Sequence, residues 1–392
     1  MSRQQSPVRF LLISWNMPPA AGGAAVVTRN LLMNFDPDSC VLMGQLPSHG
    51  RMSLEGFENY RRIEIPSPSL HWRVKPWLEP FYSVPKTIRE GCRAVREYDL
   101  QAVVAVYPNA AMLYAGYRIA KKMGLPFFPH FHNLYIESMT NPLDRAVARR
   151  IQQVVFEGAK HVFSMSQGMT DFYREHYGQE STPLLHPLNL PIPEYEELSI
   201  PEKPYTVTFS GSVNFTMLEP LRQVIHAIGD DPDYRIVLHS YVSTKQIRDL
   251  AGVWADNIEV RDKEKQEELV ASLNECDVCL MGLHNGLGQQ AEWDFRTQFP
   301  TRTLEMLVAR KPILLFSPKE YFFARFMDEN GCARVVDTLD PAVIRREIDQ
   351  MCTDNGVRSA CVKAALDVAE NYRGPVVAEV LRSHIERAVH RR

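Results

Sequence analysis

Short apolar runs rich in β-branched residues alternate along the chain with segments whose apolar residues recur at helical spacing. Runs in the first half predict strands at 8–14, 40–45, 102–107 and 126–132. Helical spacing predicts helices that begin near Ala25 and that span 85–98 and 110–123. Strands that are apolar throughout are typical of a parallel sheet with crossover helices on both faces.

The same alternation resumes after a segment rich in proline and glutamate, residues 187–205. Runs beyond it predict strands at 205–210, 235–240, 258–261, 277–282, 311–316 and 332–336. A chain of 392 residues exceeds what one core usually supports. We therefore expect an α/β chain of two Rossmann-like, doubly wound domains, 1–195 and 203–373, with the C-terminal helix 374–392 joining the first. Ligands of such sheets bind beyond the carboxyl ends of the strands, which predicts a site in an interdomain cleft.

Charge and cysteine content narrow the class of protein. The chain carries 44 Lys and Arg against 47 Asp and Glu, so its net charge of -3 offers no general attraction for nucleic acid. Seven scattered cysteines, an odd number, do not form the pattern of a disulfide framework and favour a reducing cytoplasm. No apolar stretch approaches the roughly 20 residues that a membrane-spanning helix needs. We expect a cytoplasmic protein that does not cross a membrane.

The segment TQFPTRTLEMLVARKPILLF holds the clearest candidate chemistry. A loop ending at Pro300 leads into a helix near Thr301, so free backbone N–H groups and a positive dipole end could meet a diphosphate. Arg302 adds a fixed positive charge that can bind phosphate bidentately, and Thr301 and Thr303 are further donor-binding candidates. Glu305, about one turn in, could accept hydrogen bonds from both hydroxyls of a ribose. The alternative treats Glu305 as a favourable charge near a helix N-terminus and Arg302 as solvated surface.

Four segments, PPAAGG, GLPFFPHFHNLYIES, VTFSGS and QFPTRTLEMLVARKPIL, follow one another across nearly the whole chain. In them the sequence resembles the GT-B glycosyltransferases of family 4, the retaining class that uses nucleotide diphosphate sugars. The resemblance implies transfer of a sugar from a UDP- or GDP-sugar to a glycan or lipid-linked acceptor, in cell-surface polysaccharide or glycoconjugate synthesis. It also implies that the leaving diphosphate takes the acceptor proton, so the protein supplies positioning and electrostatic stabilisation. We expect no cofactor and no metal.

The resemblance assigns two contacts to the first domain. Gly22 and Gly23 would let the backbone approach the donor phosphate or the acceptor closely, although a plain strand-to-helix turn is the alternative. His132 falls where the family has a histidine near the donor sugar and the reacting centre, which makes it the candidate catalytic residue. A satisfied structural histidine is the alternative for His132. His130 and Glu137 lie nearby, but no third ligand is assured and we expect no metal site.

Further contacts follow for the second domain. Gly211 and Ser212 match the loop after its first strand and can offer backbone and hydroxyl donors to phosphate oxygens. Asn214 lies one turn further and could add an amide contact or cap the loop. Glu305 occupies the position of the ribose-binding glutamate.

The chain departs from the family at three places. Thr297 stands where many members have a second glutamate, and Asn133, in place of an aspartate, cannot act as a general base. The segment SVNFTMLEPL lacks the family's Arg and Lys, so Arg302 carries more of the diphosphate charge. A non-catalytic nucleotide-sugar-binding scaffold and a two-Rossmann sugar-nucleotide epimerase therefore stay open as alternatives. A dinucleotide dehydrogenase is disfavoured because neither glycine loop contains GxGxxG.

Two short motifs resemble metal sites but have simpler explanations. Cys276 and Cys279 form a CxxC within a predicted buried strand and have no second CxxC, so we interpret them as core residues. The sequence Asp-Pro-Asp at 36–38 and at 231–233 lies between a helix and a strand, where these residues make turns.

The stretch 69–96 combines aromatic with basic side chains. Its aromatic residues are Trp72, Trp77, Phe81 and Tyr82, and its basic residues are Arg73, Lys75, Lys86, Arg89, Arg93 and Arg96. This composition suits peripheral contact with an anionic membrane at its inner face, or with a lipid-linked acceptor. The alternative is a loop that packs its aromatic residues on the first domain, followed by a solvated helix face.

Overall fold

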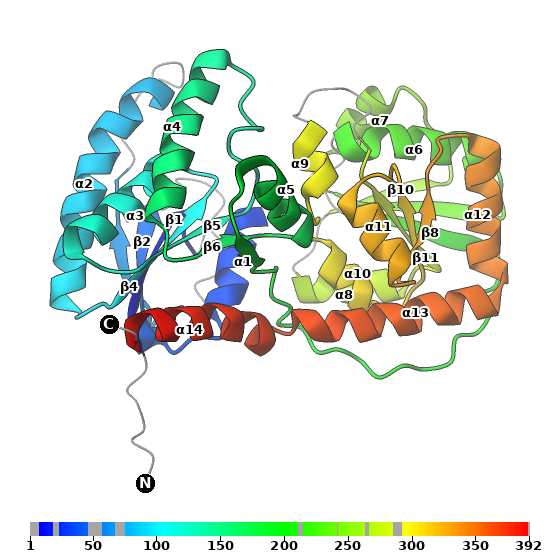
Figure 1. The fold of residues 1–392 in the computed structure, drawn as a ribbon. Coiled ribbons are helices and arrows are strands. Elements are labelled where there is room, and N and C mark those ends of the chain that lie inside the picture. The colour runs from blue at the N-terminus through cyan, green and yellow to red at the C-terminus, as the bar shows by residue number, and fades with distance from the viewer. Residues whose placement is uncertain are drawn as a thin grey trace, which may run out of the picture. The chain divides into compact units, whose positions relative to one another are not determined.

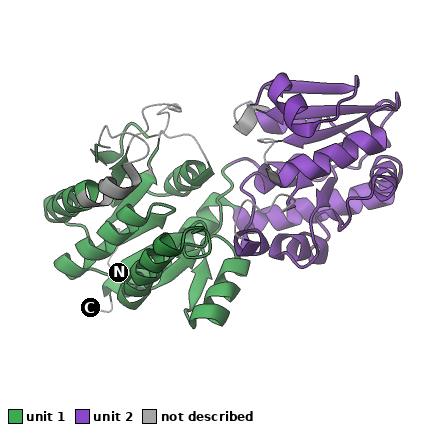
Figure 2. Ribbon diagram, turned by 90° about the horizontal axis from the view of Figure 1, so that it is seen from above, with its two compact units in different colours: residues 1–189, 373–392 green, residues 190–372 purple. Residues whose placement is uncertain are grey.

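The computed structural model describes residues 8–18, 23–45, 57–66, 75–210, 215–240, 242–262, 266–284 and 292–390. The chain divides into two compact units, which Figure 2 colours separately. Unit 1 comprises Met1–Asn189 and Arg373–Arg392, and unit 2 comprises Leu190–Tyr372. Each unit is built on one parallel sheet, so the predicted α/β class with two doubly wound sheets is confirmed.

The strands of unit 1 are β1 (Phe10–Asn16), β2 (Cys40–Gln45), β3 (Arg61–Glu64), β4 (Ala102–Tyr107), β5 (Phe127–Phe131), β6 (Val162–Ser164) and β7 (Ser181–Pro183). Their order in the sheet is β3-β2-β1-β4-β5-β6-β7 (Figure 1). The sheet grows one way from β1 to β3 and the other way from β4 to β7, so the direction reverses between β1 and β4. In such a sheet a ligand site is expected at the carboxyl ends of strands near this reversal.

The helices of unit 1 are α1 (Gly23–Leu32), α2 (Lys75–Glu97), α3 (Ala110–Met123), α4 (Pro142–Gly158), α5 (Gln167–Tyr177) and α14 (Gly374–His390). Alternate residues of β1 enter two separate cores, because successive strand residues point to opposite faces. Leu11 and Ile13 pack with residues of α2 to α5. Phe10 and Leu12 pack with residues of α14, so the end of the chain helps to complete unit 1.

Local sequence explains why α3 has the predicted bounds. The Asn109 side chain accepts a hydrogen bond from the Met112 backbone N–H and so caps the first turn. Gly124 ends the helix in the left-handed conformation, with φ of 64°, that glycine adopts without strain.

The prediction for α2 was wrong at its start, since the helix begins at Lys75 and not at Pro85. Proline is common in the first turn of a helix, which made Pro85 a plausible beginning. Inside a helix it removes one backbone hydrogen bond, and extensive packing against α3 accompanies the longer helix. The strands β3, β6 and β7, of three or four residues each, were not predicted.

Unit 2 contains β8 (Tyr205–Ser210), β9 (Tyr234–Ser240), β10 (Ile258–Asp262), β11 (Val278–Gly282), β12 (Ile313–Phe316) and β13 (Arg334–Val336), in the order β10-β9-β8-β11-β12-β13. Its helices are α6 (Phe215–Ile228), α7 (Thr244–Ala251), α8 (Gln266–Asn274), α9 (Glu292–Thr297), α10 (Thr303–Val308), α11 (Phe322–Glu329), α12 (Pro341–Thr353) and α13 (Asn355–Ala369). Residues 191–204, within the segment rich in proline and glutamate, have no regular secondary structure. Of the helices in the described ranges, none has the length and apolar character needed to span a bilayer.

The two motifs interpreted as structural are confirmed as such. Cys276 and Cys279 are buried free thiols whose sulfur atoms lie 3.7 Å apart beside and within β11. Each Asp-Pro-Asp forms a turn. The Asp36 side chain accepts a hydrogen bond from the Asp38 backbone N–H at 2.9 Å, and the Asp231 side chain accepts one from the Asp233 backbone N–H, also at 2.9 Å.

Candidate functional site

The glycine loop of unit 1 lies mostly outside the described residues. Gly22 is not described, whereas Gly23 is the exposed first residue of α1. Gly23 therefore stands where the loop after β1 enters its helix, at the carboxyl edge of the sheet. A contact of either glycine with a donor phosphate or an acceptor stays a prediction.

His132 follows directly after β5 at the same edge. Its backbone N–H donates to the Tyr107 carbonyl at the end of β4, at 3.3 Å, and its side chain is 9% exposed. The Nε2 atom lies 3.2 Å from Nδ1 of His130, and Nε2 of His130 lies 3.1 Å from the Leu184 carbonyl oxygen. Sequence reasoning placed His130 near His132 but missed this chain of hydrogen bonds, because Leu184 is 54 residues away. Within the described ranges, no three His, Cys, Asp or Glu side chains are grouped to hold a metal ion.

A third buried histidine, His186, lies near this pair and was not among the predicted site residues. The Asn30 amide nitrogen, on α1, is 3.3 Å from Nε2 of His186 and 3.2 Å from the Pro187 carbonyl oxygen. The helix that follows the glycine loop is thereby tied to the segment that follows β7. The one available signal was the His-Pro pair that opens the segment rich in proline.

Burial sets the protonation of these histidines. It lowers the pKa of His130 from its ordinary 6.5 to about 3, against a small opposing effect of the hydrogen bond to Leu184. Burial also lowers the pKa of His132 well below 6.5, and the electrostatic effects of His130 and His186 act in the same direction. At neutral pH the pair is therefore uncharged.

The depressed pKa of His130 predicts a loss of stability in acid. Above pH 6.5 the residue is neutral whether the chain is folded or unfolded. Below that pH His130 is protonated in the unfolded chain, whereas in the folded chain it stays neutral down to about pH 3. The free energy of unfolding therefore falls as pH drops from 6.5 to about 3. At pH 5 the expected loss is about 2 kcal/mol.

Urea unfolding at a series of pH values measures this effect. Between pH 6 and pH 4, the variant His130→Asn is expected to show a slope shallower by about 1.2 kcal/mol per pH unit than the parent. The matched control is His390→Gln, at the exposed end of α14. Equal slopes in the parent and in His130→Asn would contradict the buried neutral state of His130.

Arg302 is anchored at the carboxyl end of β8 in unit 2. Its Nη1 donates to the carbonyl oxygen of Ser210, the last residue of β8, at 2.6 Å and lies 2.8 Å from the Met217 sulfur. Burial lowers the pKa of Arg302, while the carboxylate of Glu305 opposes the shift. The interpretation of Arg302 as a solvated surface charge is therefore wrong. Gly211, Ser212 and Asn214, which follow Ser210, lie outside the described residues, and their contacts stay predictions.

The helix that carries Glu305 is short and buried. It is α10, which begins at Thr303 rather than near Thr301, and all six of its residues are buried. The Thr303 hydroxyl donates to the Pro300 carbonyl at 2.7 Å and so closes the turn before the helix. Glu305 lies in the first turn and is 7% exposed. The structure thus gives Arg302 and Glu305 neighbouring positions, whereas Thr301 and Thr303 stay donor-binding candidates on sequence grounds.

Thr297, which replaces a family glutamate, is the last residue of α9. It is buried, and its hydroxyl donates to the Trp293 carbonyl at 2.9 Å. Asp294 precedes it by one turn on the same helix and is 3% exposed. Sequence reasoning missed this buried carboxylate, although an acidic residue three positions from an expected glutamate was a visible signal. Asn133 follows His132 and is partly buried.

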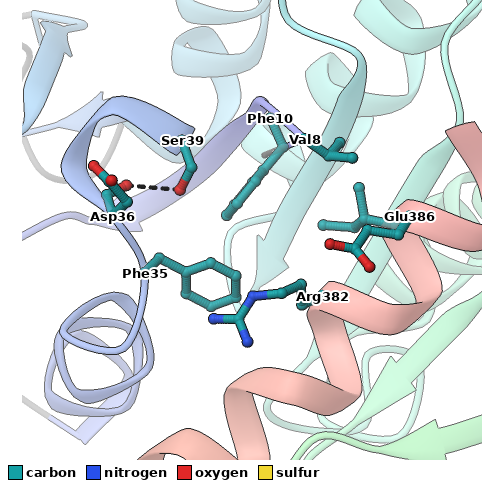
Figure 3. Close-up of a pocket in the computed structure, with 8 residues that line it drawn as sticks. Val8, Phe10, Phe35, Asp36, Ser39, Arg382 and Glu386 are labelled. Carbon is teal, nitrogen blue, oxygen red and sulfur yellow. Dashed lines mark hydrogen bonds between the residues drawn. The ribbon is translucent and has the colours of Figure 1, made fainter. Parts of the chain in front are cut away.

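A pocket in unit 1 lies away from these residues. It has a volume of about 120 Å³ and is lined mainly by Val8, Phe10, Phe35, Arg382 and Ile385 (Figure 3). Phe10 opens β1, so the pocket is at the amino edge of the sheet, opposite to the edge that carries His132. Ligand pockets for small molecules usually enclose about 300 Å³ or more. The size and position of this pocket exclude it as the candidate site.

Comparison with known proteins supports the sequence resemblance. The family model of the glycosyl transferase 4-like domain matches residues 41–187, a range that includes β5 and His132. No curated protein sequence matches the chain significantly.

Solved structures resemble the chain over almost its whole length. A glycosyltransferase from Rickettsia africae ESF-5 has 12% identity and a TM-score of 0.65, over 98% of this chain and 99% of that one. Anabaena HepE, in complex with UDP and glucose, has 12% identity and a TM-score of 0.69, over 97% and 99%. The lipopolysaccharide outer core galactosyltransferase WaaB has 12% identity and a TM-score of 0.61, over 97% and 99%. At these identities the likeness shows the fold, and the predicted GT-B fold is confirmed.

Proposed function

We propose that this chain, which has the GT-B fold and matches the model of the glycosyl transferase 4-like domain over residues 41–187, transfers a sugar from a UDP- or GDP-sugar to a glycan or lipid-linked acceptor. The observation that carries the proposal is the position of Arg302. Its guanidinium is held at the carboxyl end of β8, and Glu305 follows within the next helical turn. A fixed cation beside a buried carboxylate suits a diphosphate joined to a ribose.

The geometry of Arg302 supports a contact with phosphate. Nη1 is used by the Ser210 carbonyl and the Met217 sulfur. Within the described part of the chain, no hydrogen-bond partner of Nε or Nη2 occurs. These two nitrogens form one edge of the guanidinium, and this edge can donate two parallel hydrogen bonds to phosphate oxygens. Glu305 would accept from the ribose hydroxyls.

We propose a retaining reaction in which the donor supplies the base. The bond between the anomeric carbon and the diphosphate oxygen breaks, and the acceptor oxygen bonds to the same face of that carbon. The acceptor proton passes to the leaving diphosphate, whose growing charge Arg302 stabilises. This role for Arg302 needs no metal. HepE, whose structure holds UDP and glucose, and the galactosyltransferase WaaB support a role in polysaccharide or glycoconjugate synthesis.

The proposed location is the cytoplasm, with peripheral contact at the inner membrane face through 69–96. The aromatic side chains Trp72, Trp77 and Phe81 lie outside the described residues. In the described part of α2, Tyr82 is 54% exposed, and the Arg89 and Arg93 side chains are 73% and 75% exposed. Exposed basic and aromatic side chains on one helix suit an anionic lipid surface, and flotation with anionic and with neutral vesicles tests this contact.

A turnover assay with a panel of UDP- and GDP-sugars and lipid-linked or glycan acceptors tests the reaction. We expect glycosylated acceptor, release of the nucleoside diphosphate and activity that survives EDTA. The donor nucleotide should also raise the melting temperature, because a ligand that binds only the folded state stabilises it. Donor binding without transfer would favour a scaffold, and conversion of the donor sugar without an acceptor would favour an epimerase. Either result would contradict the proposed transfer.

A further inference from the structure

The hydrogen bonds around His132 determine which of its nitrogens carries the proton. A carbonyl oxygen only accepts, so Nε2 of His130, 3.1 Å from the Leu184 oxygen, must carry a hydrogen. In the neutral ring the Nδ1 atom of His130 is then a bare acceptor. It lies 3.2 Å from Nε2 of His132, which must therefore donate. His132 consequently has its proton on Nε2 and a bare Nδ1.

Burial keeps both histidine rings neutral. His130 is 1% exposed and His132 9% exposed. Among the residues that the structure describes, His130 on β5 and His186 after β7 lie close to the His132 ring, and the Tyr107 carbonyl at the end of β4 accepts from the His132 backbone N–H. None of them is a carboxylate that could stabilise an imidazolium, and burial lowers the pKa of both histidines of the pair. The pair therefore stays neutral around neutral pH.

The bare Nδ1 of His132 is unsatisfied. It is a buried atom with no hydrogen-bond partner among the residues that the structure describes. Buried polar atoms in folded proteins are nearly always paired, and exceptions are often functional. A bare imidazole nitrogen can accept a hydrogen bond from a hydroxyl but can donate nothing to a phosphate. The missing partner is thus a hydrogen-bond donor, and sugar hydroxyls are donors of this kind.

We infer that His130 is a positioning residue that holds His132 as a hydrogen-bond acceptor for a hydroxyl of the donor sugar or of the acceptor. This inference rests on the proposed function, because the hydroxyl belongs to a substrate of that reaction. It assigns to His132 no proton transfer. The Leu184 carbonyl, which accepts from Nε2 of His130, then determines which nitrogen of each ring carries the proton. The general principle is that the partner of one ring nitrogen sets the state of the other.

We call the hydrogen-bonded chain from the Leu184 carbonyl through His130 to His132 the relay. Nitrogen-15 NMR of histidine-labelled protein tests it without any substrate. The His132 signals, assigned by their loss in His132→Gln, should show a protonated Nε2 and a bare Nδ1 at pH 7. In His130→Leu, where the acceptor is removed, a mixture of both tautomers is expected. In His130→Asn, whose amide oxygen can replace the bare Nδ1, the native tautomer should return. A protonated Nδ1 in the parent, or an unchanged spectrum in His130→Leu, would overturn the relay.

Steady-state kinetics then test whether the relay contributes to sugar transfer. His130→Leu should lower kcat/KM about tenfold, and His130→Asn should recover most of this loss. The control is His161→Leu, which changes a partly buried histidine of unit 1 that lies outside the relay, with Nε2 2.8 Å from the Thr182 hydroxyl. Melting temperatures show which variants fold. If His130→Asn is folded but its kcat/KM stays as low as that of His130→Leu, His130 does not act by positioning His132.

Substrates that lack single hydroxyls identify the source of the hydrogen bond. Monodeoxyfluoro nucleotide sugars remove donor hydroxyls one at a time, and deoxy acceptors do the same for the acceptor. For the analogue that lacks the relevant hydroxyl, His130→Leu should cause no further loss, because the bond is already absent. Equal further losses with every analogue would overturn the hydroxyl contact. If no donor supports transfer at all, the proposed function fails, while the NMR result still decides the relay.

Discussion

Replacing Arg302 by lysine is expected to lower kcat/KM about 100-fold. The guanidinium donates to the Ser210 carbonyl through Nη1, and within the described ranges Nε and Nη2 have no partner, so the proposal assigns them to phosphate. An ammonium group cannot make both sets of bonds in this planar arrangement. Steady-state kinetics with the preferred nucleotide sugar measure the loss. The affinity for UDP or GDP should fall with it, whereas the affinity for the free nucleoside should not change, because the nucleoside has no diphosphate.

A control separates this effect from a loss of fold. Arg346→Lys changes another arginine of unit 2, whose side chain is 69% exposed, and should leave kcat/KM unchanged. Loss of the link to Ser210 should lower the melting temperature of Arg302→Lys, so kinetics are measured well below it. A variant that is less stable but fully active at such a temperature would show that Arg302 only braces α10 against β8.

Replacing Glu305 by glutamine is expected to weaken binding of the nucleotide roughly 10- to 100-fold. Hydrogen bonds to a charged group contribute about 1.5–3 kcal/mol each, and the amide has one acceptor oxygen where the carboxylate has two. Glutamine is nearly isosteric with glutamate, so the packing around the 7% exposed side chain should persist. Titration calorimetry with UDP and GDP measures the change.

Burial of Glu305 also changes what an alanine variant can show. Glu305→Ala should weaken donor binding too, but the truncation leaves a void in a fully buried helix and should reduce stability as well. The glutamine variant is therefore the cleaner test. Glu329→Gln, at the exposed end of α11, is the matched control. Unchanged affinity in a folded Glu305→Gln would show that the ribose is not placed at Glu305.

Together these variants test separate parts of the proposed function. The proposal assigns the nucleotide diphosphate to Arg302 and Glu305 of unit 2, and a substrate hydroxyl to His132 of unit 1, which His130 orients. Loss of nucleotide affinity in the first two and not in the His130 variants would support this division. The family glutamate expected at Thr297 is missing, but α9 carries another buried carboxylate, Asp294, one turn earlier.

Sequence alone determined the class of fold and most of its elements. Strands such as β4 and β8 are buried on both faces, so they appear as continuous apolar runs between helical segments, and this pattern survives without any partner. The bounds of α3 were predictable for a similar reason, because Asn109 and Gly124 act within their own turn of helix. The candidate donor segment was visible because Arg302 and Glu305 lie close together in sequence.

Tertiary structure decided what these residues contact. The bond from Arg302 to Ser210 joins residues 92 positions apart, and the chain from His132 through His130 ends 54 positions away at Leu184. Such contacts depend on which strands become neighbours in the sheet, and the local spacing of apolar residues does not reveal the strand order. Burial is likewise a property of the assembled sheet, and it is the main cause that lowers the pKa of the histidine pair and of Arg302. Composition and spacing therefore identified candidate groups, whereas packing determined their charge, their partners and the atoms they leave for a ligand.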